Sequence, residues 1–307
     1  MKVGFIGLGN MGGGMSLNMR KAGFEMVVHD LNHEAAARQI EAGCEWADSP
    51  LEVAKASDIV FTSLPGPPEV EAVALGPDGL IAGMRAGTTW FDLSTNSPTV
   101  IRRLHAEFAA QGINMLDAPV SGGKTGADRG LLAIWVGGDE AEFNKHKPLL
   151  DSIGDAPKYI GPIGAGSVAK LVHNLSAYAI QAALAEAFTM GVKAGVDPLP
   201  LWEAIRYGAM GRRRAFDTLS GLMEAKWDPA SFALKLAFKD VTLATQLARE
   251  VHVPMRISNL VREELEEAMG RGWGDRDSRI AMLLQEERAG LDIKIPIEEI
   301  EEVRNRG

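Results

Sequence analysis

Short apolar runs rich in β-branched residues alternate with longer mixed segments through the first half of this 307-residue chain. The alternation is typical of βαβ units, in which buried parallel strands are followed by helices. We expect strands at residues 3–6, 26–29, 59–64, 88–93, 113–116 and 132–136, and helices at 11–22 and 140–150. The glycine-rich stretch 121–126 is predicted to be a turn. Residues 1–163 are therefore predicted to form an α/β domain with a doubly wound, parallel sheet.

The pattern changes after residue 163, because small and apolar residues dominate 168–194 and no strand-like run follows. As one unbroken helix this stretch would be about 40 Å long, with Gly195 as its terminator. Further helices are predicted at 199–207, 215–225, 234–250 and 255–269, and a short helix or frayed tail at 296–306. We expect residues 164–307 to form an all-helical domain for substrate binding or oligomerisation, linked to the first domain by the long helix.

Composition narrows the function classes. The net charge of −9 argues against a nucleic-acid partner, which requires a basic surface. Charged residues or glycines interrupt the apolar stretches before the roughly 20 residues that a bilayer requires, so we expect no membrane span. The single cysteine, Cys44, excludes an internal disulfide, and the six histidines show no zinc-binding spacing. We therefore expect a cytoplasmic protein without a metal site.

A glycine motif directly follows the first predicted strand and begins a predicted helix. It reads Gly7-Leu8-Gly9-Asn10-Met11-Gly12. In this context Gly7 permits a tight turn, Gly9 lets a pyrophosphate approach the backbone, and Gly12 allows close packing of helix on strand. The motif predicts a Rossmann-type dinucleotide site that all six residues line; a glycine-rich turn without a ligand is the alternative.

Asp30 ends the second predicted strand, 23 positions after Gly7. A carboxylate at this spacing accepts hydrogen bonds from the adenosine ribose diol and repels a 2′-phosphate. Residues 31–33 contain no arginine, so NAD is favoured over NADP; the alternative role for Asp30 is a helix cap. Further cofactor contacts are predicted where later strands end, at Leu64, Pro65, Ser94 and Thr95, which could otherwise be ordinary turn residues.

Four motifs together resemble the β-hydroxyacid dehydrogenase family, which includes 3-hydroxyisobutyrate dehydrogenase-like proteins. The first is the cofactor turn at residues 5–12. The other three are Asp117-Ala118-Pro119-Val120-Ser121-Gly122-Gly123 with Gly126, Ala127 and Gly130; Gly164-Ala165-Gly166-Ser167-Val168-Ala169-Lys170-Leu171-Val172-His173-Asn174; and Lys239-Asp240. They occur in the family's order and span most of the chain.

The resemblance implies the roles of the site residues. Ser121, Gly122 and Gly123 would hold the substrate carboxylate, and small residues do expose backbone N–H groups suited to an anion; a bulge or tight turn is the alternative. Lys170 would be the general acid/base, although alone it could be a surface lysine whose stem covers apolar residues. Asn174, four positions later on the same helix face, would complete the catalytic pair.

Two features of the second domain bear on the substrate. Lys239 would lie near the cofactor and the substrate, as the resemblance implies. The run Arg212-Arg213-Arg214 has no counterpart in the family pattern. It could be a solvated or salt-bridged face, or Arg213 could face the cleft and bind a second anionic group, since guanidinium binds carboxylate bidentately. The family usually has two adjacent asparagines where this chain has His173 and Asn174, and we interpret His173 as a packing residue.

The resemblance implies an NAD-dependent enzyme that interconverts a 3-hydroxy acid and its aldehyde or ketone. Three alternatives stay open. They are an imine reductase-like enzyme, which usually replaces the lysine, a semialdehyde reductase that uses NADPH, and a non-catalytic dinucleotide-binding protein. The exact substrate, a small molecule with a carboxylate, is left open. The long alanine-rich helix with apolar positions suggests a homodimer or homotetramer.

Overall fold

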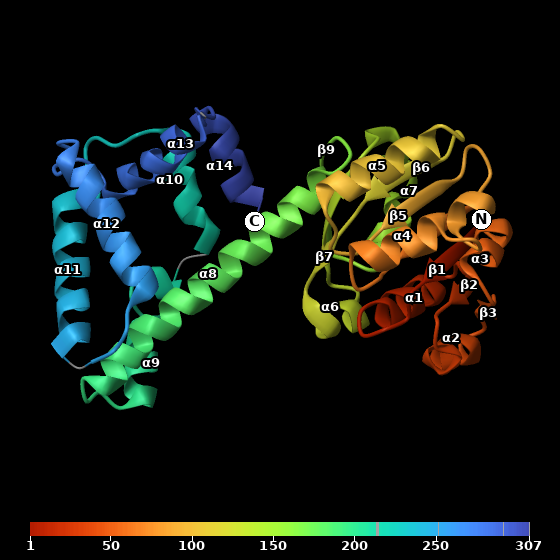
Figure 1. Ribbon diagram of the computed structural model, residues 1–307, viewed down its shortest axis with the longest axis horizontal. Coiled ribbons are helices and arrows are strands. Elements are labelled where there is room, and N and C mark those ends of the chain that lie inside the picture. Colours follow the sequence, from red (N-terminus) through yellow and green to blue (C-terminus); the bar gives the residue numbers. More distant parts are fainter. Residues whose placement is uncertain (213–214, 251, 291, 307) are drawn as a thin grey trace. The chain divides into compact units, whose positions relative to one another are not determined.

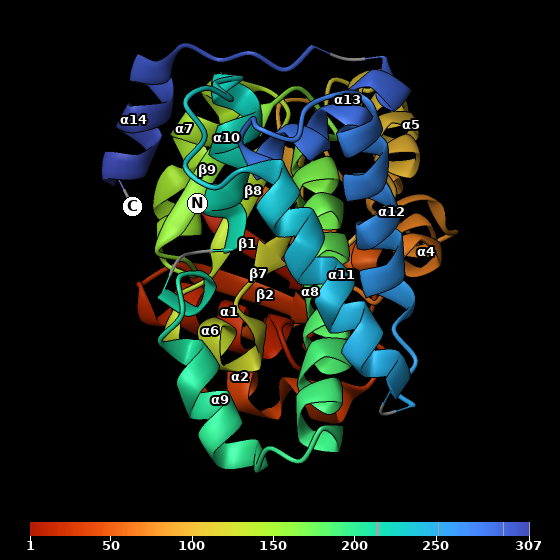
Figure 2. The ribbon, with the colours of Figure 1, turned by 90° about the vertical axis from the view of Figure 1, so that its left-hand side faces the viewer.

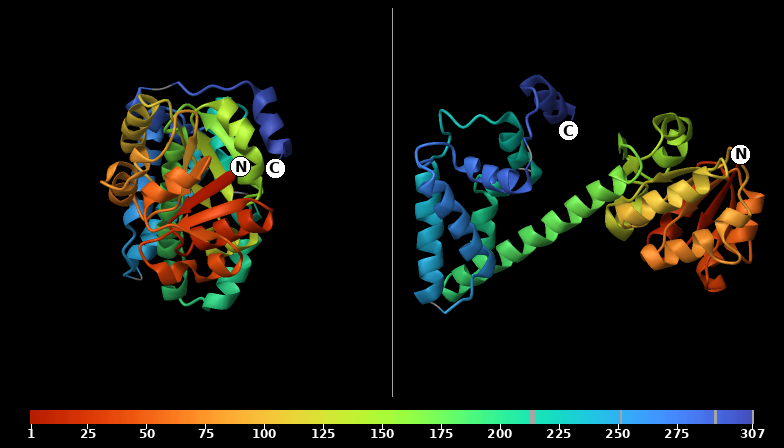
Figure 3. Two further views of the ribbon diagram at one scale, coloured as in Figure 1. Left: turned by 90° about the vertical axis from the view of Figure 1, so that its right-hand side faces the viewer. Right: turned by 45° about the horizontal axis from the view of Figure 1, so that its top comes forward.

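The computed structural model describes residues 1–212, 215–250, 252–290 and 292–306. Contacts divide the chain into two units, Met1–Ser176 and Ala177–Gly307. The division falls within the helix α8 (Ala165–Lys193), which is one unbroken helix (Figure 3). The first turns of α8, including Lys170, therefore belong to the first unit.

A nine-stranded sheet forms the centre of the first unit, with the order β3-β2-β1-β4-β5-β6-β8-β7 and with β9 paired to β8. Its strands are β1 (Lys2–Ile6), β2 (Glu25–His29), β3 (Glu45–Trp46), β4 (Ile59–Thr62), β5 (Thr89–Asp92), β6 (Asn114–Asp117), β7 (Val120–Ser121), β8 (Ala133–Gly137) and β9 (Ala156–Gly161). The strands from β3 to β6 are parallel, whereas β8 runs antiparallel to β6 and β7. Parallel pairing brings the carboxyl ends of β1, β4 and β5 to one edge.

Helices cover both faces of this sheet, as the doubly wound prediction requires. One face packs against α1 (Gly12–Lys21), α6 (Gly123–Arg129) and α7 (Glu140–Asp151), and the other against α3 (Pro50–Ala56), α4 (Pro67–Leu75) and α5 (Pro98–Ala109). The short α2 (Ala37–Glu41) and the 3₁₀ turns η1 (His33–Ala36) and η2 (Leu80–Ala82) complete the unit. Figure 1 shows these helices around the strands. Phe5, Phe61 and Phe91 stack side by side in the hydrophobic core between the sheet and α1.

The predicted turn at residues 121–126 is wrong in part, because Gly123–Arg129 forms the helix α6. Two of its seven residues are glycines, which lowers intrinsic helix propensity. Packing against α1 compensates. A Cβ added to Gly14 would lie 2.8 Å from Asp128 Oδ1, and Asn18 Nδ2 donates to the carbonyl of Ala127 at 2.8 Å.

The second unit is all-helical, as predicted. Its elements are the remainder of α8, α9 (Pro198–Arg206), η3 (Met210–Arg212), η4 (Ala215–Leu219), α10 (Ser220–Glu224), α11 (Leu234–Glu250), α12 (Arg256–Gly270), η5 (Ser278–Met282), α13 (Leu283–Ala289) and α14 (Ile297–Arg306). α11 and α12 lie side by side (Figure 2). Trp227, Leu234 and Ile280 are among the buried residues of the core. The helix predicted at 215–225 is divided into η4 and α10.

Glu186 anchors α8 within the second unit. Its carboxylate accepts hydrogen bonds from the backbone N–H groups of Arg256, Ile257 and Ser258 at 2.8–3.1 Å, which are the first residues of α12. These groups lack partners inside their own helix, so the carboxylate caps α12.

Within the described part of the chain, α8 is the single helix whose length and composition would suffice to cross a membrane.

Candidate active site

The turn between β1 and α1 has the geometry that its three glycines predict. Gly7 has φ +91°, a conformation that favours glycine. A Cβ on Gly12 would lie 1.8 Å from the Gly7 carbonyl oxygen, so only glycine lets α1 begin so close to the strand. A Cβ on Gly9 would have no neighbour within 4 Å, because this position faces an open cavity. The backbone is thus accessible where the motif predicts a pyrophosphate.

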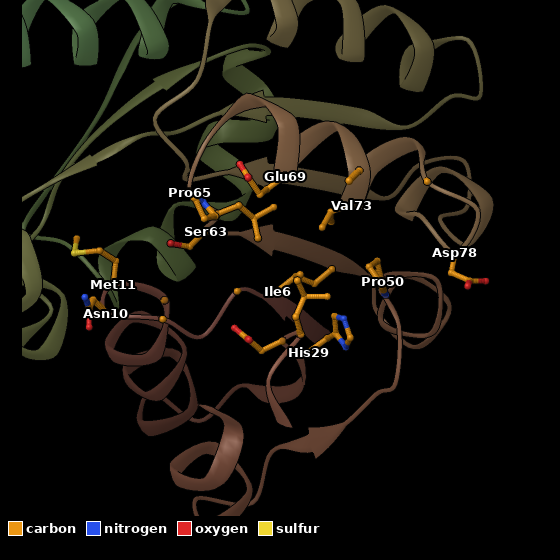
Figure 4. Close-up of a pocket in the computed structure, with 18 of the residues that line it drawn as sticks. Ile6, Asn10, Met11, His29, Pro50, Ser63, Pro65, Glu69, Val73 and Asp78 are labelled. Carbon is orange, nitrogen blue, oxygen red and sulfur yellow. The ribbon is translucent and has the colours of Figure 1, made fainter. Parts of the chain in front are cut away.

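The cavity beside this turn has a volume of about 660 Å³ (Figure 4). Seven of the predicted cofactor contacts line it together with Asp30; they are Gly7, Gly9, Asn10, Met11, Gly12, Leu64 and Pro65. Leu8 contributes its backbone N–H, which donates to Asp30 Oδ2 at 2.7 Å. The residues predicted after β1, β2 and β4 are therefore brought together in one cavity. The open space beside the Gly9 backbone fits a bound dinucleotide.

Asp30 is held in place by two backbone donors. Besides the bond from Leu8, the N–H of Asn32 donates to Oδ1 at 2.9 Å. Each oxygen keeps a further lone pair for a hydroxyl group. The other acidic residues of the wall are Glu69 and Asp78, and among the described lining residues there is no lysine or arginine. The electrostatics of this wall are therefore unfavourable to an added phosphate.

A second cavity of about 260 Å³ adjoins the first, since Met11, Ser63 and Leu64 line both. Besides Met11 and Leu64, the predicted residues in its wall are Ser94, Thr95, Ser121, Gly122, Gly123 and Lys170. A Cβ on Gly123 would meet no atom within 4 Å, and its φ is +62°. The space at the Cβ position of Gly123, a lining residue of the cavity, is therefore open.

Lys170 is buried in the wall of this smaller cavity, with 9% of its surface exposed. Its Nζ donates to the Val120 carbonyl oxygen at 2.7 Å and lies 6.0 Å from the centre of the Trp135 ring. Burial disfavours the charged form and lowers the pKa of Lys170 below its ordinary value of 10.5. A lysine amine closer to neutrality can exchange a proton with a bound hydroxyl or carbonyl group.

Asp117, at the end of β6, determines where α8 begins. Its Oδ1 accepts from the N–H of Gly164 at 2.7 Å and its Oδ2 from Ser167 at 2.6 Å. A Cβ on Gly166 would lie 2.2 Å from the Trp135 carbonyl oxygen, so the first turn of α8 packs directly on β8. Asp117 therefore positions Lys170, one turn further along the helix. Sequence reasoning placed Asp117 in a motif but did not assign it this role.

Asp92 performs a similar task at the end of β5. It is fully buried and accepts hydrogen bonds from Thr62 Oγ1, Asn96 Nδ2 and the backbone N–H of Ser94. Burial raises the pKa of Asp92, and these bonds oppose the rise. Ser94 Oγ in turn accepts from the N–H of Leu64 at 2.9 Å. Asp92 thus ties the loop after β4, which lines both cavities, to the loop after β5, which lines the smaller one; sequence reasoning missed this role.

The remaining predicted site residues are placed differently. Asn174 is half-buried one turn after Lys170, and its Oδ1 lies 3.2 Å from His173 Nδ1. The His173 ring packs against Trp135, which agrees with a packing role but adds the contact to Asn174. Lys239 lies in α11, in the second unit, and its side chain is outside the described part of the structure, as is Arg213.

Comparisons with known proteins identify both halves of the chain. The family model described as the NAD binding domain of 6-phosphogluconate dehydrogenase matches residues 2–161. The model described as NAD-binding of NADP-dependent 3-hydroxyisobutyrate dehydrogenase matches residues 164–285.

Individual relatives match over almost their whole length. The 2-(hydroxymethyl)glutarate dehydrogenase of Eubacterium barkeri is 36% identical over 95% of this chain and 97% of its own. The NAD-dependent L-serine dehydrogenase of Pseudomonas aeruginosa is 34% identical over 92% and 97%. The solved structure of the 3-hydroxyisobutyrate dehydrogenase of Mycobacterium tuberculosis with L-serine has a TM-score of 0.65 and 27% identity, and covers 92% of this chain and 98% of that one.

Proposed function

Because the chain belongs to the β-hydroxyacid dehydrogenase family of oxidoreductases, we propose that it uses NAD to interconvert a 3-hydroxy acid and its aldehyde or ketone. The observation that carries this proposal is the smaller cavity. Its wall combines a buried lysine with the backbone of residues 121–123, which is open at Gly123, and it adjoins the cavity beside the glycine turn. This arrangement supports a proton acceptor and a carboxylate site next to a dinucleotide site.

Lys170 is the proton-transferring group in this proposal. A bound nicotinamide ring supplies the acceptor for the hydride that leaves the carbinol carbon. Neutral Lys170 accepts the proton of the substrate hydroxyl at Nζ, while the Val120 carbonyl holds the amine in place. In the reverse direction, protonated Lys170 donates that proton to the oxygen of the aldehyde or ketone. The lowered pKa of Lys170 raises the share of neutral amine near neutral pH.

The other residues bind and orient the substrate. The backbone N–H groups and the hydroxyl of Ser121, Gly122 and Gly123 hold its carboxylate. The amide of Asn174 orients the reacting hydroxyl, and Lys239 would add positive charge near the reacting centre, as in the family pattern. Arg213 would contribute only if the substrate carries a second anionic group.

The acidic wall of the larger cavity supports NAD over NADP. Asp30, Glu69 and Asp78 line it, and a 2′-phosphate placed beside Asp30 would meet repulsion without a compensating cation among the described lining residues. The Asp30 carboxylate is already fixed by Leu8 and Asn32, so it need not be reordered to accept the ribose hydroxyls.

The test is turnover of L-serine, 3-hydroxyisobutyrate and 2-(hydroxymethyl)glutarate with NAD⁺ and with NADP⁺. We expect Lys170→Ala to lower kcat about 100-fold or more, as loss of an acid/base group does, and to leave NADH binding unchanged in a fluorescence titration. Lys145→Ala is the matched control, because Lys145 is exposed on α7 and paired with Glu142. No turnover of any of the three acids by the wild-type protein, or near-normal kcat in Lys170→Ala, would contradict the proposal.

We also propose that the protein forms a homodimer or homotetramer. Several apolar side chains along the first half of α8 are exposed, including Leu171, Val172 and Leu175, the last at 73%. Exposed apolar surface of this kind is typical of protein interfaces. Light scattering after size-exclusion chromatography measures the mass of the particle, and a single-chain mass of 32.9 kDa would exclude this proposal.

A further inference from the structure

One aromatic side chain touches the catalytic helix at two places. Trp135, on β8, packs against the His173 ring, with ring centres 5.1 Å apart and planes tilted by 45°. The Nζ of Lys170 lies 6.0 Å from the centre of the same indole ring. Lys170 and His173 are three positions apart on α8, so both side chains lie on one face of the helix. Trp135 therefore fixes the imidazole of His173 on the lysine side of α8.

The imidazole in turn contacts Asn174. Its Nδ1 lies 3.2 Å from the Asn174 Oδ1 atom. An amide oxygen can only accept a hydrogen bond, so Nδ1 carries the hydrogen and donates it. This bond occupies the oxygen end of the Asn174 amide. In the described part of the chain no residue accepts from Nδ2, so the two amide N–H groups stay available as donors.

The orientation of this amide matters for the proposed reaction. The substrate oxygen that exchanges a proton with Lys170 must accept a hydrogen bond from a neighbouring donor in its carbonyl form and as charge develops on it. If the Asn174 amide were rotated by 180°, its oxygen would face the substrate oxygen and repel it. A fixed amide avoids this unproductive state, and small errors of position lower turnover strongly.

We propose that His173 and Trp135 are positioning residues for the reaction, acting through Asn174. Trp135 holds the imidazole, His173 donates to Asn174 Oδ1, and the Asn174 amide thereby keeps its N–H groups for the oxygen on the reacting carbon of the substrate. This inference rests on the proposed function, in which Lys170 and Asn174 act on a 3-hydroxy acid. It assigns a task to the histidine that replaces one of the two asparagines of the family pattern.

Two variants of His173 separate the contribution of its ring from that of its Nδ1–H donor. His173→Phe keeps an aromatic ring against Trp135 and removes the N–H group. His173→Asn removes the ring and keeps an amide donor near the position of Nδ1. With NAD⁺ and whichever of the three acids the wild type turns over best, we expect kcat to fall about tenfold in His173→Phe and less than threefold in His173→Asn. KM for NAD⁺ should stay unchanged in both, and a merely structural role would not separate them in this order.

A double variant tests whether His173 acts through Asn174. If it does, His173→Phe combined with Asn174→Ala should have the kcat of Asn174→Ala alone, because the orientation of a missing amide no longer matters. Independent losses that multiply in the double variant would overturn the proposal. So would a kcat of His173→Phe within twofold of wild type. If His173→Phe does not fold, as judged by circular dichroism, Trp135→Leu provides the same comparison with Asn174→Ala.

The outcomes distinguish this inference from the proposed function. If the wild type turns over none of the three acids, or if Lys170→Ala and Asn174→Ala both retain normal kcat, the proposed function fails and this inference fails with it. If those two variants lose activity and His173→Phe and Trp135→Leu do not, the proposed function stands and only the positioning role is refuted.

Discussion

The buried carboxylate of Asp117 is the most direct point at which to test how the sheet positions α8. Its two oxygens accept from the N–H groups of Gly164 and Ser167, and only 1% of the residue is exposed. Hydrogen bonds to a charged group contribute about 1.5–3 kcal/mol each, and a buried N–H left without a partner costs about 1–3 kcal/mol. Asp117→Asn keeps one acceptor and places an amide N–H₂ against the other donor. We therefore expect it to destabilise the start of α8 by about 2–3 kcal/mol.

Hydrogen exchange measures this loss at the two amides concerned. A decrease of about 2–3 kcal/mol in the free energy of local opening corresponds to exchange that is about 30- to 150-fold faster. Because Lys170 lies one turn beyond Ser167, kcat should also fall, by about tenfold or more. Asp139→Asn is the control, since Asp139 caps α7 through the Glu142 N–H but is exposed. Exchange at Gly164 and Ser167 within threefold of wild type in Asp117→Asn would refute the reasoning.

Three further predictions concern other parts of the chain. Asp30→Asn should raise KM for NAD about tenfold or more and increase relative use of NADP; a wild-type protein that already prefers NADP in steady-state kinetics would contradict the assignment. Burial alone would raise the pKa of Glu186, but hydrogen bonds from Ile257 and Ser258 outweigh it and lower the pKa below 4.5. The stability from this group is thus complete above about pH 4.5 and lost as pH falls through the lowered pKa, so Glu186→Gln should flatten that part of an acid-unfolding curve; an unchanged curve would exclude the cap. Arg213→Ala should leave KM for the hydroxy acid unchanged if the arginine run is solvated, whereas a several-fold rise with KM for NAD constant would place it at the substrate.

The first unit was predictable where local signals and tertiary packing agree. The strands β1, β2, β4, β5 and β6 are apolar runs that stay buried on both faces, and the glycine turn carries its own geometry. The spacing of Lys170 and Asn174 likewise follows from helical periodicity. These features depend on a few consecutive residues, so the sequence alone reveals them.

Other features depend on contacts between distant segments, so local patterns did not reveal them. The helix α6 forms against α1 although its glycines disfavour it. The strand β9 contains Pro157, which argues against a central strand, and it pairs only with β8 at the end of the sheet. In the sequence, Asp117 and Asp92 resemble ordinary strand ends. Their buried hydrogen bonds come from α8 and from the loop after β5, so they exist only in the folded chain.

The grip of Asp117 on α8 bears on how the nucleotide-binding half could be produced as a separate recombinant fragment. A fragment ending at residue 163 would retain all nine strands, since β9 ends at Gly161. It would nevertheless remove Gly164 and Ser167, so the Asp117 carboxylate would lose both of its donors. The hydrogen bonds to this carboxylate would then no longer contribute to stability. A fragment ending at Ser176, where the contacts divide, keeps both donors and Lys170. The stability of the sheet therefore depends in part on α8, a helix that continues into the second unit.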